Sequence, residues 1–337
     1  MKYASLLFFL TSAILFSQRA DFSTIDFSIA DRIAERSKGA GLNNLPVLTH
    51  DLTSHLSTDV EKFRAIYTWV STNIENDYRG YQKTRNKRIQ LANDQEAFLA
   101  WNSVYAPKMF QKMLKDKQTA CSGYAYLIRE MAELADIECK IVNGFGRTPN
   151  VILTADSPPN HAWNAVKLND KWYLCDATWS AGRIILEDSG PRFEHRYNDG
   201  YFLADPELFI KNHYPLEIDY ALLAAPPSFE EFAEGPILYK EAFTHGSLPL
   251  SPSKMHIETL KHEMIHFTFS FFNTVKTDAI SMLLKKGNSS EKVRPEIAVQ
   301  QNKYVLKHTF EKLGLYDVHI QVDEEIVATY VVRVKRK

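Results

Sequence analysis

The stretch HAWNAVKLNDKWYLCDATW, residues 161–179, decides the fold because it places one tight turn between two segments in which apolar and polar residues alternate. Residues 161–168 and 171–179 have the alternation of apolar and polar residues that is typical of half-buried strands. Asn169 and Asp170 between them are residue types that two-residue hairpin turns favour. The sequence therefore predicts an antiparallel hairpin.

The register of this hairpin brings two polar side chains to one face. If the turn is centred between Asn169 and Asp170, His161 and Asp176 become diagonal neighbours on adjacent strands. A carboxylate in that place can accept a hydrogen bond from the histidine and fix its tautomer, which leaves the other ring nitrogen free to face a nucleophile. Cys175 points to the opposite face.

A nucleophile is available at the start of a helix that the sequence predicts over residues 121–135. Cys121 lies in the first turn, where the helix dipole and the unpaired backbone N–H groups favour a thiolate. Its own N–H can serve as an oxyanion donor, and the small residues Ser122 and Gly123 let a substrate carbonyl approach. The alternative is a buried cysteine with a packing role. The expected apolar stripe consists of Tyr124, Leu127, Ile128, Met131 and Leu134.

The other cysteines and the metal ligands give weaker signals. Three cysteines are too few for a disulfide framework, so Cys139 and Cys175 are interpreted as buried packing residues, with a disulfide between them as the alternative. The chain has no C-x-x-C pair, and its one H-x-x-x-H pair, His262 and His266, lies in a segment with the alternation of a strand, not on a helix where both side chains would share a face. We therefore expect neither a metal site nor a cofactor.

Upstream, helical spacing of apolar residues predicts a helix over 60–74, with a capping box formed by Thr58 and Glu61. Residues 78–95 are polar and charged and suggest a surface loop, which a helix near 96–115 follows. Residues 139–145 have the alternation of a further strand. These segments complete the elements expected around Cys121.

Four regions follow from composition along the chain. Lys2, the apolar stretch 4–16 and Ser17 predict a signal peptide over residues 1–17 and hence export to the periplasm or the cell exterior; a membrane anchor or a buried helix is the alternative. A catalytic domain is expected over 18–225 and a proline-rich linker over 226–236. Several short alternating segments over 237–337 predict a β-sandwich of immunoglobulin-like size.

Charge composition argues against nucleic acid as a partner. Forty basic residues balance forty-one acidic ones, and no long run of lysine or arginine forms a basic stripe.

Three strings resemble the transglutaminase-like superfamily, which has a papain-like fold, and within it the branch related to kyphoscoliosis peptidase. They are TACSGYAYL (119–127), residues 161–179 and YFLADPELFI (201–210). The resemblance implies an α+β core in which a helix-start cysteine packs on an antiparallel sheet. It also implies Cys121 as nucleophile, His161 as base and Asp176 as the third member of a triad. By analogy with papain-like enzymes, Gln118 is a candidate second oxyanion donor.

Two functions remain open. The first is an exported thiol-dependent acyl-transfer enzyme that acts on polypeptide amide bonds through a thioester, as a protease, deamidase or transglutaminase. The second is a catalytically idle scaffold that binds protein or cell-wall partners. Trp163, on the same face as Asp176, either shields the His161–Asp176 bond from water or simply packs in the core.

Overall fold

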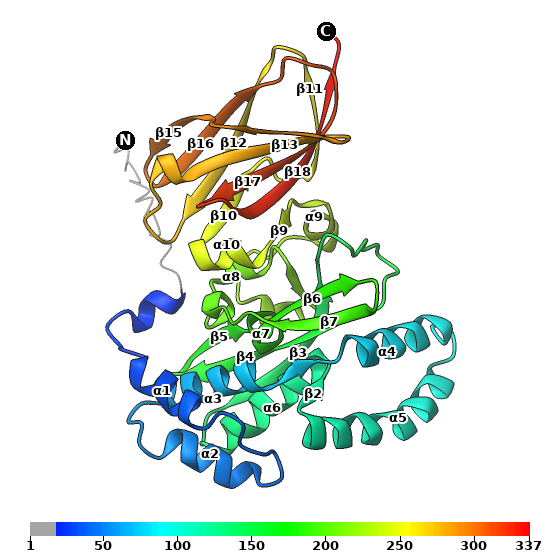
Figure 1. Cartoon of the computed structure of the whole chain (residues 1–337), viewed down its shortest axis with the longest axis vertical. Coiled ribbons are helices and arrows are strands. Elements are labelled where there is room, and N and C mark those ends of the chain that lie inside the picture. The colour runs from blue at the N-terminus through cyan, green and yellow to red at the C-terminus, as the bar shows by residue number, and fades with distance from the viewer. Residues whose placement is uncertain (1–17) are drawn as a thin grey trace, which may run out of the picture.

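A computed structural model describes residues 18–337 of the chain. The predicted signal peptide, residues 1–17, lies outside the described residues. Within 18–337, no helix combines the length and the apolar character needed to cross a membrane. Helices surround a small sheet in one half of the molecule, and the other half is rich in β-strands (Figure 1).

The first half begins with four helical segments, of which α1, α2 and α3 pack on one another. The central one is α3, Asp59–Asn73, whose two faces are largely buried. Its N-terminus has the predicted capping box, in which Thr58 and Glu61 bond each other's backbone N–H groups. The others are η1 (Gln18–Phe22), α1 (Ser28–Arg36) and α2 (Leu45–Thr53).

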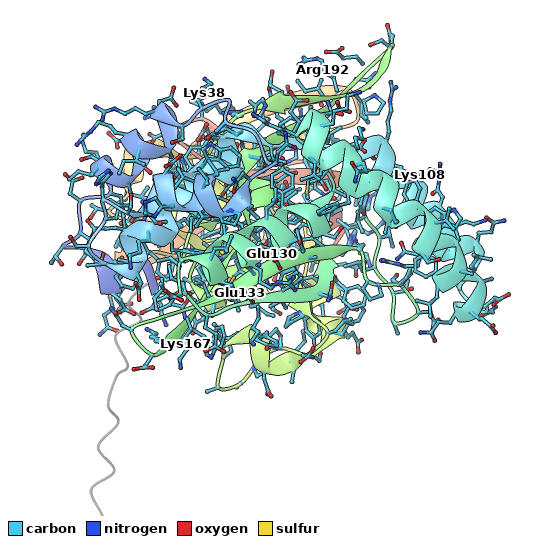
Figure 2. The ribbon with its side chains drawn as sticks, turned by 90° about the horizontal axis from the view of Figure 1, so that it is seen from below. Lys38, Lys108, Glu130, Glu133, Lys167 and Arg192 are labelled. Carbon is cyan, nitrogen blue, oxygen red and sulfur yellow. The ribbon has the colours of Figure 1, made fainter. Side chains whose placement is uncertain are left out.

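A helical hairpin extends from this half, formed by α4 (Tyr78–Gln90) and α5 (Gln95–Asp116). Figure 2 shows it reaching beyond the rest of the domain, with Lys108 on α5. The prediction of a surface loop over 78–95 was wrong, because Asp77 caps a helix there by accepting a bond from the Gly80 N–H. Gly80 is the one buried residue of α4, so no apolar stripe marked this helix in the sequence.

A four-stranded antiparallel sheet holds the predicted hairpin. Its order is β5 (Lys171–Cys175), β4 (His161–Leu168), β3 (Cys139–Gly146) and β8 (His213–Pro215). The register is as predicted, with Asn164 opposite Cys175, and both turn residues, Asn169 and Asp170, have positive φ. Helix α6, Cys121–Leu134, packs against β3 and β4.

Two details of these elements differ from the prediction. The strand expected to run to Trp179 ends at Cys175, because the Asp176 carboxylate caps a short helix, α7 (Ala177–Ala181). Leu134, expected on the buried stripe of α6, is 47% exposed at the last turn of that helix.

Short elements complete the first half and lead to the β-rich half. Strands β1 (Glu75–Asn76) and β2 (Gln118–Thr119) pair in parallel, and β6 (Gly182–Glu187) pairs with β7 (Gly190–His195). Helix α9, Phe229–Glu234, occupies part of the expected linker. The remaining elements are η2 (Asp199–Tyr201), α8 (Pro206–Phe209), η3 (Ile218–Ala221), β9 (Ile237–Leu238) and α10 (Lys240–His245).

The β-rich half consists of two sheets that face each other across a core, where the Phe267 ring of one lies 4.9 Å from the Tyr330 ring of the other. The first sheet has the order β10 (Ser247–Ser251), β12 (Met264–Phe271), β16 (Lys303–Thr309) and β15 (Glu296–Gln300). The second has the order β11 (His256–Leu260), β18 (Glu325–Lys335), β17 (Gly314–Val322), β13 (Ile280–Lys286) and β14 (Ser289–Val293), and η4 (Thr277–Ala279) precedes β13.

The two halves share one hydrophobic cluster. It joins Trp163 and Phe209 of the first half to the core of the two sheets. The ring of Phe243 on α10 stacks on that of Tyr201, with centroids 4.1 Å apart. The strand that carries His161 is therefore braced from the β-rich side of the molecule.

Candidate active site

The structure brings His161 and Asp176 into direct contact. His161 opens β4, Asp176 follows the last residue of β5, and His161 Nε2 lies 2.7 Å from Asp176 Oδ2. The other carboxylate oxygen accepts the backbone N–H groups of Thr178 and Trp179 at 2.8 and 3.2 Å. The helix cap fixes the carboxylate, and the carboxylate fixes the histidine, which leaves Nδ1 as the free ring nitrogen.

A second histidine, which sequence reasoning missed, shares the same carboxylate oxygen. His213 Nε2 lies 3.0 Å from Asp176 Oδ2, and its Nδ1 lies 2.6 Å from Asn212 Oδ1. The side chain is fully buried, and its ring stacks on that of Phe209 with centroids 4.0 Å apart. Asp176 therefore binds two imidazoles at once.

The electrostatics separate the two histidines. Burial opposes the charge of His161, but the Asp176 carboxylate, its hydrogen bond and the neighbouring Cys121 outweigh burial and raise the pKa of His161 to about 10. Burial lowers the pKa of His213 to about 4 although Asp176 opposes that shift. Burial would raise the pKa of Asp176, but both histidines together hold it well below its usual range. The cluster thus favours a charged His161 beside a neutral His213. The one N–H of the neutral ring donates from Nε2 to Asp176, and Nδ1 accepts from the side-chain amide of Asn212, whose oxygen and nitrogen can exchange places.

Cys121 completes the set at the first turn of α6. Its N-cap residue, Ala120, offers no side-chain acceptor to the first-turn N–H groups, of which that of Gly123 donates to the Ala120 carbonyl at 2.9 Å. All three cysteines are free thiols, but Cys139 and Cys175 are buried, and Cys121 is only half-buried. Cys121 also acts on His161 directly, because its hydrogen bond and its charge both contribute to the raised pKa of that imidazole.

Cys121 and His161 line one cavity of about 590 Å³, which we call the site cavity. Trp179 also lines it, and its ring stacks on His161 at 4.9 Å with an interplanar angle of 26°. Tyr239, from the start of the β-rich half, contributes to the wall. A half-buried thiol and a histidine held by a carboxylate therefore face a space large enough for a peptide segment.

Comparison with known proteins agrees with this geometry. The family model of the transglutaminase-like superfamily matches residues 47–177, a range that includes Cys121, His161 and Asp176. This chain contains a transglutaminase-like domain.

The relatives of the transglutaminase-like domain are parts of longer proteins. Kyphoscoliosis peptidase of Homo sapiens is 31% identical over 65% of this chain and 30% of its own length. The protein of the same name from Mus musculus is 30% identical over 71% of this chain and 32% of its own length. Hillarin of Drosophila melanogaster is 23% identical, with 66% of this chain and 26% of its own length covered. The chain thus spans about a third of the length of these curated relatives.

Among solved structures, the Lin-41 filamin domain aligns with 31% of this chain and 99% of its own length. Their sequence identity is 12% and the TM-score is 0.23, which is too low to compare the two folds.

The accessory residues expected around the triad lie elsewhere in the transglutaminase-like domain. Gln118 Nε2 donates to Glu75 Oε2 at 2.9 Å instead of lining the site cavity. Ser122 is exposed and also outside the cavity wall. Trp163 is buried in the shared hydrophobic cluster, with its ring 5.9 Å from that of His161. Asn76 lines the site cavity, whereas Gln118 does not. Asn76 belongs to β1, the strand that pairs with Gln118 and Thr119 of β2.

Gly123 is required by packing beside Cys121. A Cβ at this position would lie 1.9 Å from Thr119 Oγ1, far inside van der Waals contact. The small residue that the sequence suggested for substrate access therefore serves the close approach of α6 to β2.

One group of possible metal ligands exists within the described chain. His161, Asp176 and His213 each offer a donor atom, all within 4.8 Å of one another. The contacts of 2.7 and 3.0 Å to Asp176 Oδ2 are hydrogen-bond distances, and they already satisfy both Nε2 atoms. A metal ion bound there would replace the hydrogen bond between His161 Nε2 and Asp176 Oδ2 that orients His161. The sequence signal searched for, two ligands on one element, could not have found this group because its members come from three separate segments.

Proposed function

We propose that this chain is a thiol-dependent acyl-transfer enzyme that acts on polypeptide amide bonds, with Cys121 as nucleophile, His161 as base and Asp176 as the group that orients His161. The observation that carries the proposal is the His161 Nε2–Asp176 Oδ2 contact of 2.7 Å, made at the wall of the cavity that Cys121 lines. The family match and the names of the relatives, which include two peptidases, support it.

Before substrate binds, the proton of the Cys121 thiol is held on His161 Nδ1, because Nε2 is held by Asp176 and the charged form of His161 is favoured. The thiolate attacks the amide carbon, and the carbonyl oxygen becomes an oxyanion near the Cys121 N–H. When the C–N bond breaks, the amine leaves with the proton from His161, and a thioester remains. Attack by water then gives a protease or deamidase, whereas attack by an amine gives a transglutaminase.

Two parts of the proposal concern architecture and place. The core would have the papain-like arrangement, and the β-rich half would be an immunoglobulin-like sandwich that supplies Tyr239 to the cavity wall. Export rests on the sequence of residues 1–17. A peptide substrate, and a partner in the cell envelope, belong to the same proposal.

Alkylation with iodoacetamide near neutral pH tests the nucleophile directly. We expect a single adduct on Cys121, formed much faster than on free cysteine, because an imidazolium beside a thiol stabilises the thiolate. Buried Cys139 and Cys175 serve as internal controls within the same chain. The adduct should vanish in Cys121→Ala and form more slowly in His161→Ala, as intact-mass measurement would show. Slow and equal labelling of all three thiols would favour the idle scaffold.

Turnover needs a separate assay. A peptide library screened by mass spectrometry detects hydrolysis and deamidation, and a labelled primary amine detects transamidation. Any such activity should be lost in Cys121→Ala and in His161→Ala. Activity that survives the loss of Cys121 would show that another group performs the chemistry.

A further inference from the structure

Helix α4 carries an unusual concentration of positive charge. Its sequence, YRGYQKTRNKRIQ, contains five basic residues and no acidic one, whereas the whole chain has a net charge of −1. The basic residues are Arg79, Lys83, Arg85, Lys87 and Arg88.

These charges have no carboxylate partners. Among the ion pairs of residues 18–337, none includes a basic side chain of α4. Lys83 Nζ instead lies 4.7 Å from the centre of the Tyr105 ring of α5, and the Arg88 guanidinium lies 5.6 Å from that of Phe98. A cation over an aromatic ring keeps its full charge, so α4 presents an uncompensated positive potential.

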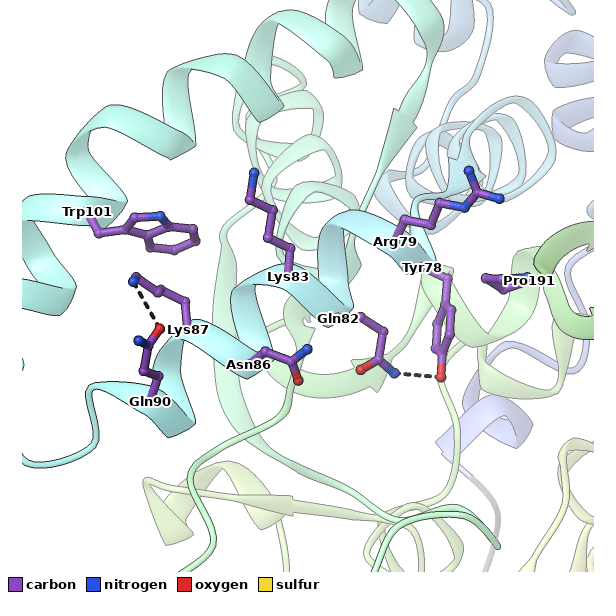
Figure 3. A pocket seen from close by; sticks show the side chains of 9 residues that line it. All are labelled: Tyr78, Arg79, Gln82, Lys83, Asn86, Lys87, Gln90, Trp101 and Pro191. Carbon is purple, nitrogen blue, oxygen red and sulfur yellow. Dashed lines mark hydrogen bonds between the residues drawn. The ribbon is translucent and has the colours of Figure 1, made fainter.

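Helix α4 also forms the wall between two adjoining hollows. A groove of about 610 Å³, which we call the α4 groove, is lined by one face of α4 together with Trp101 of α5 and Pro191 of β7 (Figure 3). Tyr81 and Arg85 of α4 line the site cavity. Tyr78 and Gln82 line both hollows, so the groove leads directly to the cavity that contains Cys121.

No aspartate or glutamate lines either hollow. The site cavity adds three basic residues to those of α4, namely Arg147, Arg183 and Lys240, of which Arg183 pairs with Glu194 at 2.6 Å. Arg147, also in its wall, is committed to the Gly235 and Pro236 carbonyl groups. The charge that remains open to a ligand thus lies mainly along α4, with Lys240 as a further basic residue in the wall of the site cavity.

The pattern of α4 side chains matches an extended polypeptide. Arg79, Lys83 and Lys87 follow one another at four-residue spacing, which puts them in a row along the helix. A second row of amides, Gln82, Asn86 and Gln90, runs beside it in the same groove. Amide side chains can both donate to and accept from a peptide backbone, whereas a phosphodiester backbone offers acceptors only.

We propose that the α4 groove binds acidic segments of the polypeptide substrate, on one side of the amide group that reaches Cys121. The inference rests on the proposed acyl-transfer function and adds the class of substrate to it. The basic row would attract the acidic side chains, the amide row would bond the backbone, and Trp101 would cover apolar side chains between them.

Binding to the full chain carrying Cys121→Ala tests the groove without turnover. The probes are a fluorescein-labelled peptide of alternating glutamate and glutamine, the corresponding peptide of lysine and glutamine, and labelled oligothymidylate, followed by fluorescence anisotropy. We expect the acidic peptide to bind best and to weaken strongly at about 0.3 M salt, because exposed charges are screened beyond a short distance. Equal binding of both peptides, or tighter binding of oligothymidylate, would overturn the proposal.

Charge removal on α4 has a matched control elsewhere in the chain. Arg79→Gln, Lys83→Gln and Lys87→Gln combined should weaken binding of the acidic peptide by about tenfold, given the usual size of exposed ion pairs. The control combines three exposed lysines of the β-rich half, Lys276→Gln, Lys303→Gln and Lys312→Gln, and should bind like the parent. Equal losses in the two variants would mean that net charge, not the groove, attracts the peptide.

The outcome is separable from that of the acyl-transfer proposal. If Cys121 is alkylated rapidly in the unmodified chain but the acidic peptide does not bind, the groove assignment is wrong and the nucleophile stands. If the peptide binds through α4 but Cys121 is as slow as free cysteine, the groove stands as a binding site and the acyl-transfer function is wrong.

Discussion

The strand hairpin of β4 and β5 and the helical hairpin of α4 and α5 both place charged groups at the site cavity, but in opposite surroundings. In the strand hairpin, the Asp176 carboxylate is buried and accepts four hydrogen bonds. In the helical hairpin, the five cations of α4 have no carboxylate partner among residues 18–337, and most of the surface is exposed.

The difference concerns what each kind of charge can do. A buried charge must be fully bonded, so its partners and its position are fixed, as orientation of a catalytic histidine requires. An exposed charge is stabilised by water and acts over a longer range, so it can attract a flexible ligand without being held rigidly. Substitutions should therefore affect stability strongly in the first hairpin and weakly in the second.

The largest effect is expected from Asp176→Asn. The substitution keeps the shape of the side chain but removes the charge that both His161 and His213 contact, so we expect the free energy of unfolding to fall by about 3–5 kcal/mol. The new amide would also donate to His161 Nε2 and move the proton to Nδ1, where it blocks transfer from Cys121. Urea denaturation and the rate of iodoacetamide labelling measure the two effects.

Asp205→Asn is the matched control for this change. Asp205 is also a buried aspartate that caps a helix, since its carboxylate accepts the Glu207 N–H at 2.9 Å. It has no histidine partner, and burial raises its pKa to about 6. Asparagine is as good a cap as aspartate, so the loss should be below about 1 kcal/mol. Equal losses at both sites would mean that the histidines add nothing to the stability of the cluster.

The next largest effect is a dependence of the free energy of unfolding on pH, which we attribute to His213. Its pKa of about 4 in the folded chain lies below the value of about 6.5 expected when unfolded, so the unfolded state binds the extra proton between these values. The free energy of unfolding should therefore fall as the pH is lowered from 6.5 to 4, by up to about 3 kcal/mol. His213→Gln should remove this part of the acid sensitivity, as urea denaturation at several pH values would show.

His161 gives a pH dependence of the opposite sign: its contribution to the free energy of unfolding falls as the pH rises, and it does so in a different pH range. Its pKa is raised to about 10, so its contribution is complete below pH 6.5 and is lost as the pH rises through 10. It therefore adds no slope between pH 4 and 6.5. If the acid sensitivity of His213→Gln equals that of the parent, the neutral state assigned to His213 is incorrect.

The contrast between the hairpins also explains what the sequence could predict. The alternation in residues 161–175 and the turn at Asn169 and Asp170 predicted the register, and the register predicted the contact of His161 with Asp176. Helix α4 was missed because it buries almost no apolar side chain, so its sequence lacks the helical spacing of apolar residues on which the prediction relied. His213 was missed because β8 has only three residues and pairs with β3 from a distant part of the chain.

A third prediction compares a buried and an exposed residue of the same helix, α5. Met113 of α5 is 2% exposed and packs in the core, whereas Leu99, nearer the tip of the hairpin, is 56% exposed. Met113→Ala should lower the free energy of unfolding by about 2 kcal/mol or more, because a buried cavity is created. Leu99→Ala should change it by less than about 0.5 kcal/mol, as is usual for exposed positions. A large loss from Leu99→Ala in urea denaturation would show that the tip is covered.

The smallest effect is expected from combined Arg79→Gln, Lys83→Gln and Lys87→Gln on α4. These cations lie at helical spacing with no carboxylate partner among the described residues, so they repel one another, and glutamine keeps the helix propensity. We expect the free energy of unfolding to rise by less than about 1 kcal/mol at low salt, and the gain to disappear at about 0.3 M salt. Urea denaturation at both salt concentrations measures it. A clear loss of stability at either salt would mean that the row has partners within the fold, and α4 would then resemble the strand hairpin rather than differ from it.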